Sequence, residues 1–223
     1  MSIRTDIAAE SFSQAGGAEK LQGVKVKNKV IENARLEVTD ITIETQEAAE
    51  KLGRPVGRYI TLTATDSTFD MYSDSFRERA EVIAKAIGEL CGGCERFLAV
   101  GLGNYALTSD AVGPLTAEKI FATRHIKSLA KELDTDDLGE VTVIQTGVLG
   151  NTGIESSEQV KAIAERVRPQ AVIAVDALAC SELSNLGRTI QLCNTGISPG
   201  SGVENARKEL SLSTLGVKCI AIG

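Results

Sequence analysis

From residue 75 to the end of the chain, helical and apolar segments alternate, and this pattern constrains the fold more than any other feature. Apolar residues at helical spacing predict helices over 75–91, 114–133 and 156–167, with Ser75 and Glu78, and Ser156 and Gln159, as capping boxes. Short apolar runs between them predict buried strands at 97–100, 141–144 and 171–175, followed by strands at 189–192 and 218–222 and a short helix at 203–210. Such alternation is typical of an α/β fold with a mostly parallel sheet flanked by helices.

The first third of the chain has a different pattern. Residues 36–43 and 59–64 alternate apolar and polar side chains, as half-buried strands do, and are predicted to extend the sheet or to form an antiparallel flap. Residues 11–34 are weakly patterned and are expected to form a surface loop. Residues 5–10 are expected to be an exposed extended segment at the terminus.

Composition excludes several classes of function. With 223 residues the chain can bury one substantial core, so a single domain is expected. The 30 acidic and 24 basic side chains leave a net charge of −6, which argues against a nucleic-acid-binding surface. No apolar run is long enough to span a membrane, and the N-terminus has no secretory signal, so the protein is expected in the cytoplasm.

The cysteines and the histidine offer little for metal or nucleophilic chemistry. Cys91 and Cys94 form the only CxxC pattern, and a tetrahedral zinc site would need a second ligand pair. The sole histidine, His125, lies in a helical run away from any strand end, so a serine or cysteine nucleophile would lack its base. The sequence therefore predicts reduced thiols, no bound metal and no cofactor.

Two aspartates lie where a short apolar run gives way to a loop. Asp176 directly follows residues 171–175, and Asp110 follows residues 97–100 after the loop 101–109. Carboxylates at the carboxyl ends of parallel strands project into the crevice where such sheets carry out chemistry. Two facing carboxylates would share one proton and could activate water, which predicts a hydrolase. An aspartate in such a place also serves as a turn former or helix cap, and for Asp110, four residues before Pro114, that alternative stays open.

Two glycine-rich segments are candidate ligand loops. Residues 101–104 do not complete a dinucleotide fingerprint, because position 106 is Ala106 rather than a third glycine. Residues 196–202 could hold a ligand or could simply form a flexible turn.

The chain resembles one family, the germination protease (spore protease) of spore-forming bacteria. The segments that carry the resemblance occur in order along the chain: RTDIA (4–8), EKLGRPVG (50–57), GLGN (101–104), TSDAVGP (108–114), GVLG (147–150), TGIE (152–155), VDALA (175–179) and NTGISPGSGV (194–203). The resemblance implies a fold similar to that of the hydrogenase-maturation endopeptidases. It also implies an endopeptidase that begins the degradation of small acid-soluble spore proteins in the spore core at germination, with Asp110 and Asp176 as its catalytic aspartates.

The resemblance also implies how the enzyme is made and assembled. The family cuts after an acidic residue in sequences such as Thr-Glu-Ile-Ala, and Thr5-Asp6-Ile7-Ala8 is similar to that site. The chain is therefore expected to be a zymogen that processes itself between Asp6 and Ile7 and forms a homotetramer. Residues 1–6 would be a short leader, and residues 7–223 a single protease domain without the C-terminal region of longer family members.

Asn104, Gly196, Ser198 and Gly200 are the residues we expect to bind the backbone of an extended peptide substrate. Two other functions stay open at this point. One is a maturation-type peptidase whose carboxylates bind a substrate metal instead of activating water. The other is a non-catalytic α/β module whose glycine loops hold a ligand.

Overall fold

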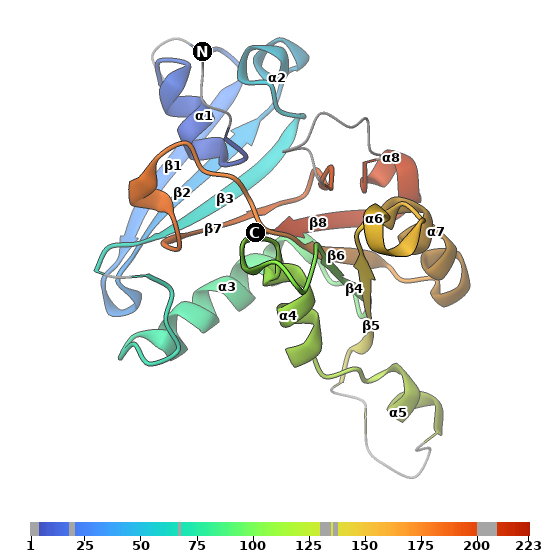
Figure 1. Cartoon of the computed structure of the whole chain (residues 1–223). Coiled ribbons are helices and arrows are strands. Elements are labelled where there is room, and N and C mark those ends of the chain that lie inside the picture. Colours follow the sequence, from blue (N-terminus) through green and yellow to red (C-terminus); the bar gives the residue numbers. More distant parts are fainter. Residues whose placement is uncertain (1–4, 18–20, 67, 130–134, 136–137, 200–208) are drawn as a thin grey trace. The chain divides into compact units, whose positions relative to one another are not determined.

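The computed structural model describes residues 5–17, 21–66, 68–129, 135, 138–199 and 209–223 (Figure 1). The chain divides into two compact units, one formed by Met1–Leu90 with Leu178–Thr195 and the other by Cys91–Ala177 with Gly196–Gly223. Within the described part of the chain, no helix has both the length and the apolar content needed to span a bilayer.

The first unit contains antiparallel strands in the order β1-β2-β3-β7, namely β1 (Val24–Ile31), β2 (Leu36–Ile43), β3 (Gly57–Ala64) and β7 (Thr189–Cys193). Helices α1 (Ala8–Gln14) and α2 (Gln46–Leu52) belong to this unit, as do the short 3-10 helices η2 (Glu32–Ala34) and η4 (Leu183–Asn185). Helix α3 (Phe76–Cys91) ends where the second unit begins. The strands predicted at 36–43, 59–64 and 189–192 are confirmed.

The prediction of a surface loop over residues 11–34 is wrong, because this stretch contains most of α1 and all of β1. Strand β1 is the edge of the sheet and its residues are largely exposed, so burial imposes little apolar alternation on it. Lysines at 25, 27 and 29 alternate along it, and charged side chains on an edge strand discourage pairing with other chains.

Helix α3 carries a buried charge that the apolar stripe did not predict. Arg79 is only 2% exposed, and its guanidinium donates to the backbone oxygens of Ala34 (3.0 Å) and Thr68 (3.2 Å). It also forms an ion pair with Asp66 and lies 5.5 Å from the centre of the Phe69 ring. These partners compensate the loss of hydration of the charge and tie α3 to the loops beside β2 and β3.

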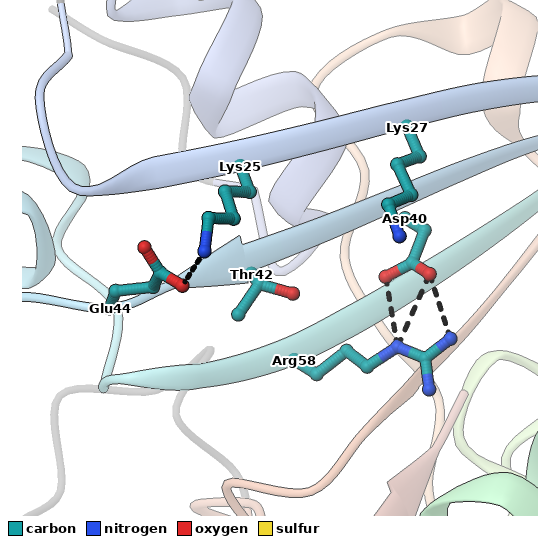
Figure 2. Close-up of a pocket in the computed structure, with 6 residues that line it drawn as sticks. All are labelled: Lys25, Lys27, Asp40, Thr42, Glu44 and Arg58. Atoms are coloured by element: carbon teal, nitrogen blue, oxygen red, sulfur yellow. Dashed lines mark hydrogen bonds and ion pairs between the residues drawn. The ribbon is translucent and has the colours of Figure 1, made fainter.

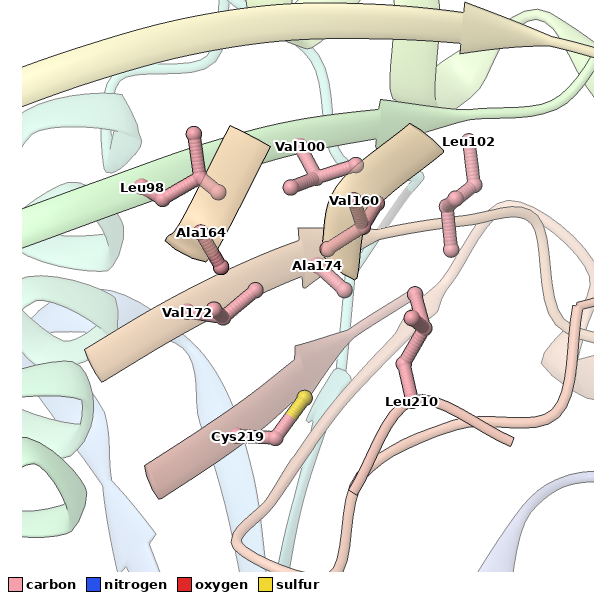
Figure 3. Packing of buried hydrophobic residues seen from close by; sticks show 9 residues of the cluster. All are labelled: Leu98, Val100, Leu102, Val160, Ala164, Val172, Ala174, Leu210 and Cys219. Carbon is pink, nitrogen blue, oxygen red and sulfur yellow. The ribbon is translucent and has the colours of Figure 1, made fainter. Parts of the chain in front are cut away.

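The second unit is a parallel sheet in the order β8-β6-β4-β5, with β4 (Arg96–Leu102), β5 (Glu140–Gly147), β6 (Ala171–Val175) and β8 (Lys218–Ile222). Its helices are α4 (Val112–Lys119), α5 (Arg124–Leu129), α6 (Leu149–Thr152), α7 (Ser156–Val167) and α8 (Leu212–Leu215), with the 3-10 helix η3 (Thr108–Asp110). Figure 3 shows side chains of β4, β6 and β8, together with Leu210 from the segment before α8, meeting those of α7 in one cluster: Leu98, Val100, Leu102, Val160, Ala164, Val172, Ala174, Leu210 and Cys219. This confirms the predicted α/β class, with helix-flanked parallel strands and additional antiparallel ones.

The predicted continuous helix over 114–133 is wrong, because the chain leaves the helical path between α4 and α5. Ile120 is extended, with φ −80° and ψ 128°. The Thr123 hydroxyl accepts from the Val141 backbone nitrogen (2.8 Å) and donates to the Gly139 carbonyl (2.5 Å). Thr123 thus bonds to β5 and the segment before it, and the helix does not continue through this point.

The capping residues were also mispredicted, although the helices themselves formed. The Ser75 hydroxyl bonds to that of Ser73 (3.0 Å), and the Ser156 hydroxyl donates to the Gly147 carbonyl (3.2 Å). The helix predicted at 203–210 falls mostly outside the described residues. A capping box does occur at Ser211, which opens α8.

Candidate active site

The two predicted aspartates follow neighbouring strands of the parallel sheet. In the β4–β6 register, Gly101 lies opposite Val175, and Asp176 comes directly after Val175. Asp110 ends η3, the 3-10 helix in the loop that leaves β4. Both carboxylates therefore belong to loops at the carboxyl end of adjacent parallel strands, the edge of such a sheet at which ligands bind.

Glycines bring α4 unusually close to these strand ends. A Cβ atom built on Gly113 would lie 2.1 Å from the Leu102 carbonyl oxygen and 2.4 Å from that of Val175. On Gly101, it would lie 2.4 Å from the Gly113 carbonyl oxygen. No other residue type fits either position without moving backbone. The first turn of α4, which begins two residues after Asp110, is thus packed directly on the ends of β4 and β6.

The loop after β4 holds the Asp110 carboxylate. The Asn104 backbone nitrogen donates to Asp110 Oδ2 (2.9 Å) and to the Asp110 carbonyl oxygen (3.0 Å). Gly103 has φ +109°, and a Cβ on it would lie 2.2 Å from the Asp110 carbonyl oxygen. The glycines of residues 101–104 therefore allow strand β4 to turn tightly around this aspartate. Asn104 contacts the candidate catalytic group through its backbone, and its role in substrate binding stays a prediction.

Asp176 is more deeply buried than Asp110. It is 7% exposed, whereas Asp110 is half-buried. Its Oδ1 accepts from the Ala177 backbone nitrogen (2.9 Å), and its own backbone nitrogen donates to the Ile222 carbonyl (3.0 Å), which extends the β6–β8 ladder. These contacts fix the position of the carboxylate at the end of β6.

One oxygen of each carboxylate is therefore engaged by a backbone amide of its own loop. Such bonds to nearby backbone amides are typical of aspartates that form turns, so this feature of the turn-former alternative is observed for both residues. The amides keep each side chain in one orientation, which is what an acid–base pair needs before substrate arrives. The catalytic role of the pair stays a prediction.

The other predicted loop is only partly described. Gly196 has φ +88°, and a Cβ on it would lie 2.0 Å from the Leu210 carbonyl oxygen. This close approach accompanies the antiparallel bridge between Ile197 and Leu210. Ser198 is exposed, and Gly200 lies outside the described residues. Residues 196–198 are thereby fixed to the core of the second unit through Leu210, and substrate binding by this loop stays a prediction.

The candidate processing site lies in the first unit; Ile7 is extended as expected, but it is buried instead of exposed, and the expected extended segment gives way to helix α1 at Ala8. Asp6 and Ala179 exchange two bonds: the Asp6 backbone nitrogen donates to the Ala179 carbonyl (2.7 Å), and the Ala179 nitrogen donates to Asp6 Oδ2 (3.0 Å). Gln191 Nε2 donates to the Asp6 carbonyl (2.9 Å), and its Oε1 accepts from the Ala8 nitrogen (2.5 Å). Ile7 is 4% exposed, and helix α1 begins at the next residue.

Glu10 is a buried carboxylate that sequence reasoning missed. It is 6% exposed, and it accepts from the Ser181 backbone nitrogen (2.8 Å), the Ser181 hydroxyl (2.6 Å) and Asn185 Nδ2 (2.6 Å). Burial raises the pKa of the Glu10 carboxyl, but hydrogen bonds from Ser181, Thr5 and Asn185 outweigh burial and lower it to about 2. Glu10 therefore stays ionised and anchors α1 to residues 181–185.

Arg54 completes this docking. Its Nη2 donates to the Thr5 carbonyl (3.0 Å) and its Nε to the Ser11 hydroxyl (3.1 Å). Burial lowers the pKa of the Arg54 guanidinium, and the charges of Asp6 and Glu10 partly offset this. The N-terminal segment is thus held on both sides of the Asp6–Ile7 bond.

A hollow of about 320 Å³ lies elsewhere, on the polar face of the first unit's sheet (Figure 2). Its charges are largely paired: Arg58 donates to Asp40 through Nε (to both carboxylate oxygens) and Nη2 (to Oδ2), and Nη2 also donates to Glu89, while Lys25 bonds to Glu44 (2.5 Å). The hollow is lined by Lys25, Lys27, Asp40, Thr42, Glu44 and Arg58. It includes neither candidate catalytic aspartate.

Among the described residues, no group of three or more His, Cys, Asp or Glu side chains could hold a metal ion. His125 is exposed in α5, as predicted.

Comparison with known proteins identifies the family. A family model described as germination protease matches residues 4–223. The chain is 38% identical to the germination protease of Clostridium perfringens over 226 residues, which cover 99% of this chain and 69% of that protein. It is 39% identical to that of Clostridium tetani over 229 residues, covering 100% of this chain and 69% of that protein, and 39% identical to that of Caldanaerobacter subterraneus over 225 residues, covering 100% and 68%.

One similar solved structure is the crystal structure of the NiFe hydrogenase maturation protease HycI from Thermococcus kodakarensis. It is 20% identical, has a TM-score of 0.37, and covers 62% of this chain and 78% of that one. The full-length family match and the sequence identities decide the assignment, and this chain belongs to the germination protease family.

Proposed function

We propose that this protein is an aspartate-dependent endopeptidase that begins the degradation of small acid-soluble spore proteins in the spore core. Membership in the germination protease family supports a protease that acts at germination. The observation that carries the proposal further is the placement of Asp110 and Asp176 at the carboxyl ends of adjacent parallel strands, each oriented by a backbone amide.

In the proposed mechanism the two carboxylates act on one water molecule. The ionised aspartate takes a proton from the water, whose oxygen attacks the carbonyl carbon of the scissile peptide bond. The protonated aspartate polarises that carbonyl by donating a hydrogen bond. This division of work requires that the two carboxyl groups differ in protonation when the substrate binds. Backbone amides at the strand ends and the 196–202 loop would position the extended peptide.

The proposal includes maturation of the enzyme. The chain would be a zymogen that cuts itself between Asp6 and Ile7, in a segment similar to the expected substrate sequence, and the active form would be a homotetramer. Its partners would be the spore proteins it cleaves.

The test is cleavage of a peptide with the Thr-Glu-Ile-Ala pattern by wild type, Asp110→Asn and Asp176→Asn, with the exposed Asp74→Asn as a matched control. Each active-site variant should lose at least ~100-fold in kcat/KM, a typical minimum for removing one acid–base group. Near-normal turnover by either would exclude the pair mechanism.

The same experiment separates the other two functions. Loss or gain of cleavage on adding a chelator would favour a maturation-type peptidase whose carboxylates bind a substrate metal. An inert binding module would cleave no peptide and would never produce a new terminus at Ile7.

A further inference from the structure

The Asp6–Ile7 bond is poorly placed for attack by any protease. Its carbonyl oxygen accepts from Gln191 Nε2, the Ile7 side chain is 4% exposed, and the helical path begins at Ala8. A protease needs a locally open segment, so cleavage requires this segment to leave its place. The resistance of the bond thus depends on what holds the segment down.

The contacts of Glu10 are one charged part of that hold, beside those of Arg54 and of the Asp6 carboxylate. Its Oε2 accepts from both the nitrogen and the hydroxyl of Ser181, and its Oε1 from Asn185 Nδ2. Hydrogen bonds to an ionised acceptor are stronger than those between neutral groups. Leaving the pocket would separate Glu10 from these donors, so the release of Glu10 adds to the free-energy cost of opening the segment.

We propose that the pocket formed by Ser181 and Asn185 is a carboxylate latch: by binding Glu10, it shields the Asp6–Ile7 bond, and processing proceeds only after the latch opens. The latch controls the self-cleavage proposed above and so rests on that function. It assigns Glu10, Ser181 and Asn185 a regulatory role outside the aspartate pair.

The latch can be tested without the enzyme's own activity. Thermolysin, which cuts before residues such as isoleucine, is applied to the full chain carrying Asp176→Asn, and the new Ile7 terminus is followed by mass spectrometry. Adding Glu10→Ala should accelerate cleavage at this bond at least ~10-fold, the factor that corresponds to losing one charged hydrogen bond. Glu47→Ala, at an exposed glutamate of α2, is the control and should leave the rate unchanged.

Asn185→Ala removes one bond of the latch and keeps Glu10, so it serves if Glu10→Ala does not fold. It should accelerate the same cleavage by a smaller factor. Rates for both variants within twofold of the control would overturn the latch.

Self-processing is then compared in chains with Asp176 intact. Faster appearance of the Ile7 terminus in Glu10→Ala supports the latch. A second outcome is that Glu10→Ala accelerates cleavage by thermolysin but no chain processes itself. This outcome supports the latch and rejects self-processing. If Glu10→Ala accelerates thermolysin but slows self-processing, the docked form presents the bond instead of shielding it, and the latch is overturned.

Discussion

The contact between α4 and the ends of β4 and β6 predicts a large effect from one added methyl group. In Gly113→Ala, the new Cβ would lie 2.1 Å from the Leu102 carbonyl oxygen and 2.4 Å from that of Val175. Both are backbone atoms in hydrogen-bonded strands, so the helix must move by about 1 Å. Overpacking of this kind typically costs about 1–3 kcal/mol of stability.

The effect on activity should exceed the effect on stability. Asp110 lies three residues before Gly113, so it moves with the first turn of α4. Displacing a catalytic group by about 1 Å can cost about 100-fold in rate. We therefore expect kcat/KM on the Thr-Glu-Ile-Ala peptide to fall about 100-fold at a temperature where circular dichroism shows the variant still folded.

Gly88→Ala is the matched control, because a Cβ at this α3 position meets no atom within 4 Å. It should keep full activity and gain about 0.5–1 kcal/mol of stability, since alanine favours helix over glycine. If Gly113→Ala retained both the activity and the stability of the wild type, the argument that α4 positions Asp110 would be refuted.

Three further predictions concern the first unit and the 196–198 loop. The lowering of the Glu10 pKa from 4.5 to about 2 corresponds to about 3 kcal/mol of folding free energy. Above pH ~4.5, the wild type should therefore be more stable than Glu10→Gln by up to this amount. Urea unfolding at a series of pH values should show this difference disappearing as the pH falls through about 2. Arg79→Leu removes one of the two ion pairs of Asp66, which keeps Arg35, and leaves the Ala34 and Thr68 carbonyls without their donor; it should lower the free energy of unfolding by about 1–3 kcal/mol, and unchanged urea midpoints would contradict the role of Arg79. In Gly196→Ala, the new methyl group would clash with the Leu210 carbonyl at a backbone φ of +88°, which weakens the Ile197–Leu210 bridge. Hydrogen exchange at the Ile197 amide should therefore accelerate. An exchange rate equal to that of the wild type would show that the bridge tolerates the methyl group.

Local pattern predicted the buried elements and the general place of the aspartates. Strand β6 is apolar along its whole length because both its faces are covered, and the residue after it, Asp176, must lie at the carboxyl edge of the sheet. Strand β1 was missed because an exposed edge imposes little alternation. The break before α5 was missed because Thr123 bonds to β5, a partner that helical periodicity cannot reveal.

The docking of the N-terminus could not be predicted from its own residues. Glu10 is bound by Ser181, which lies 171 positions later, and Gln191 is 185 positions from Asp6. The motif identified the segment as a substrate-like site, but motifs carry no information about which distant loop covers it. Ile7 and Glu10 are buried, and the segment expected to be exposed is held by contacts with Ser181 and Gln191.

The role of the aspartates is tested most directly by comparing Asp110→Asn, Asp176→Asn and the double variant in the same peptide-cleavage assay. Groups that act on one water as a unit give non-additive losses, so we predict that the double variant is no slower than the slower single variant. Rate losses that multiply in the double variant would contradict a shared water and assign the two carboxylates to independent roles.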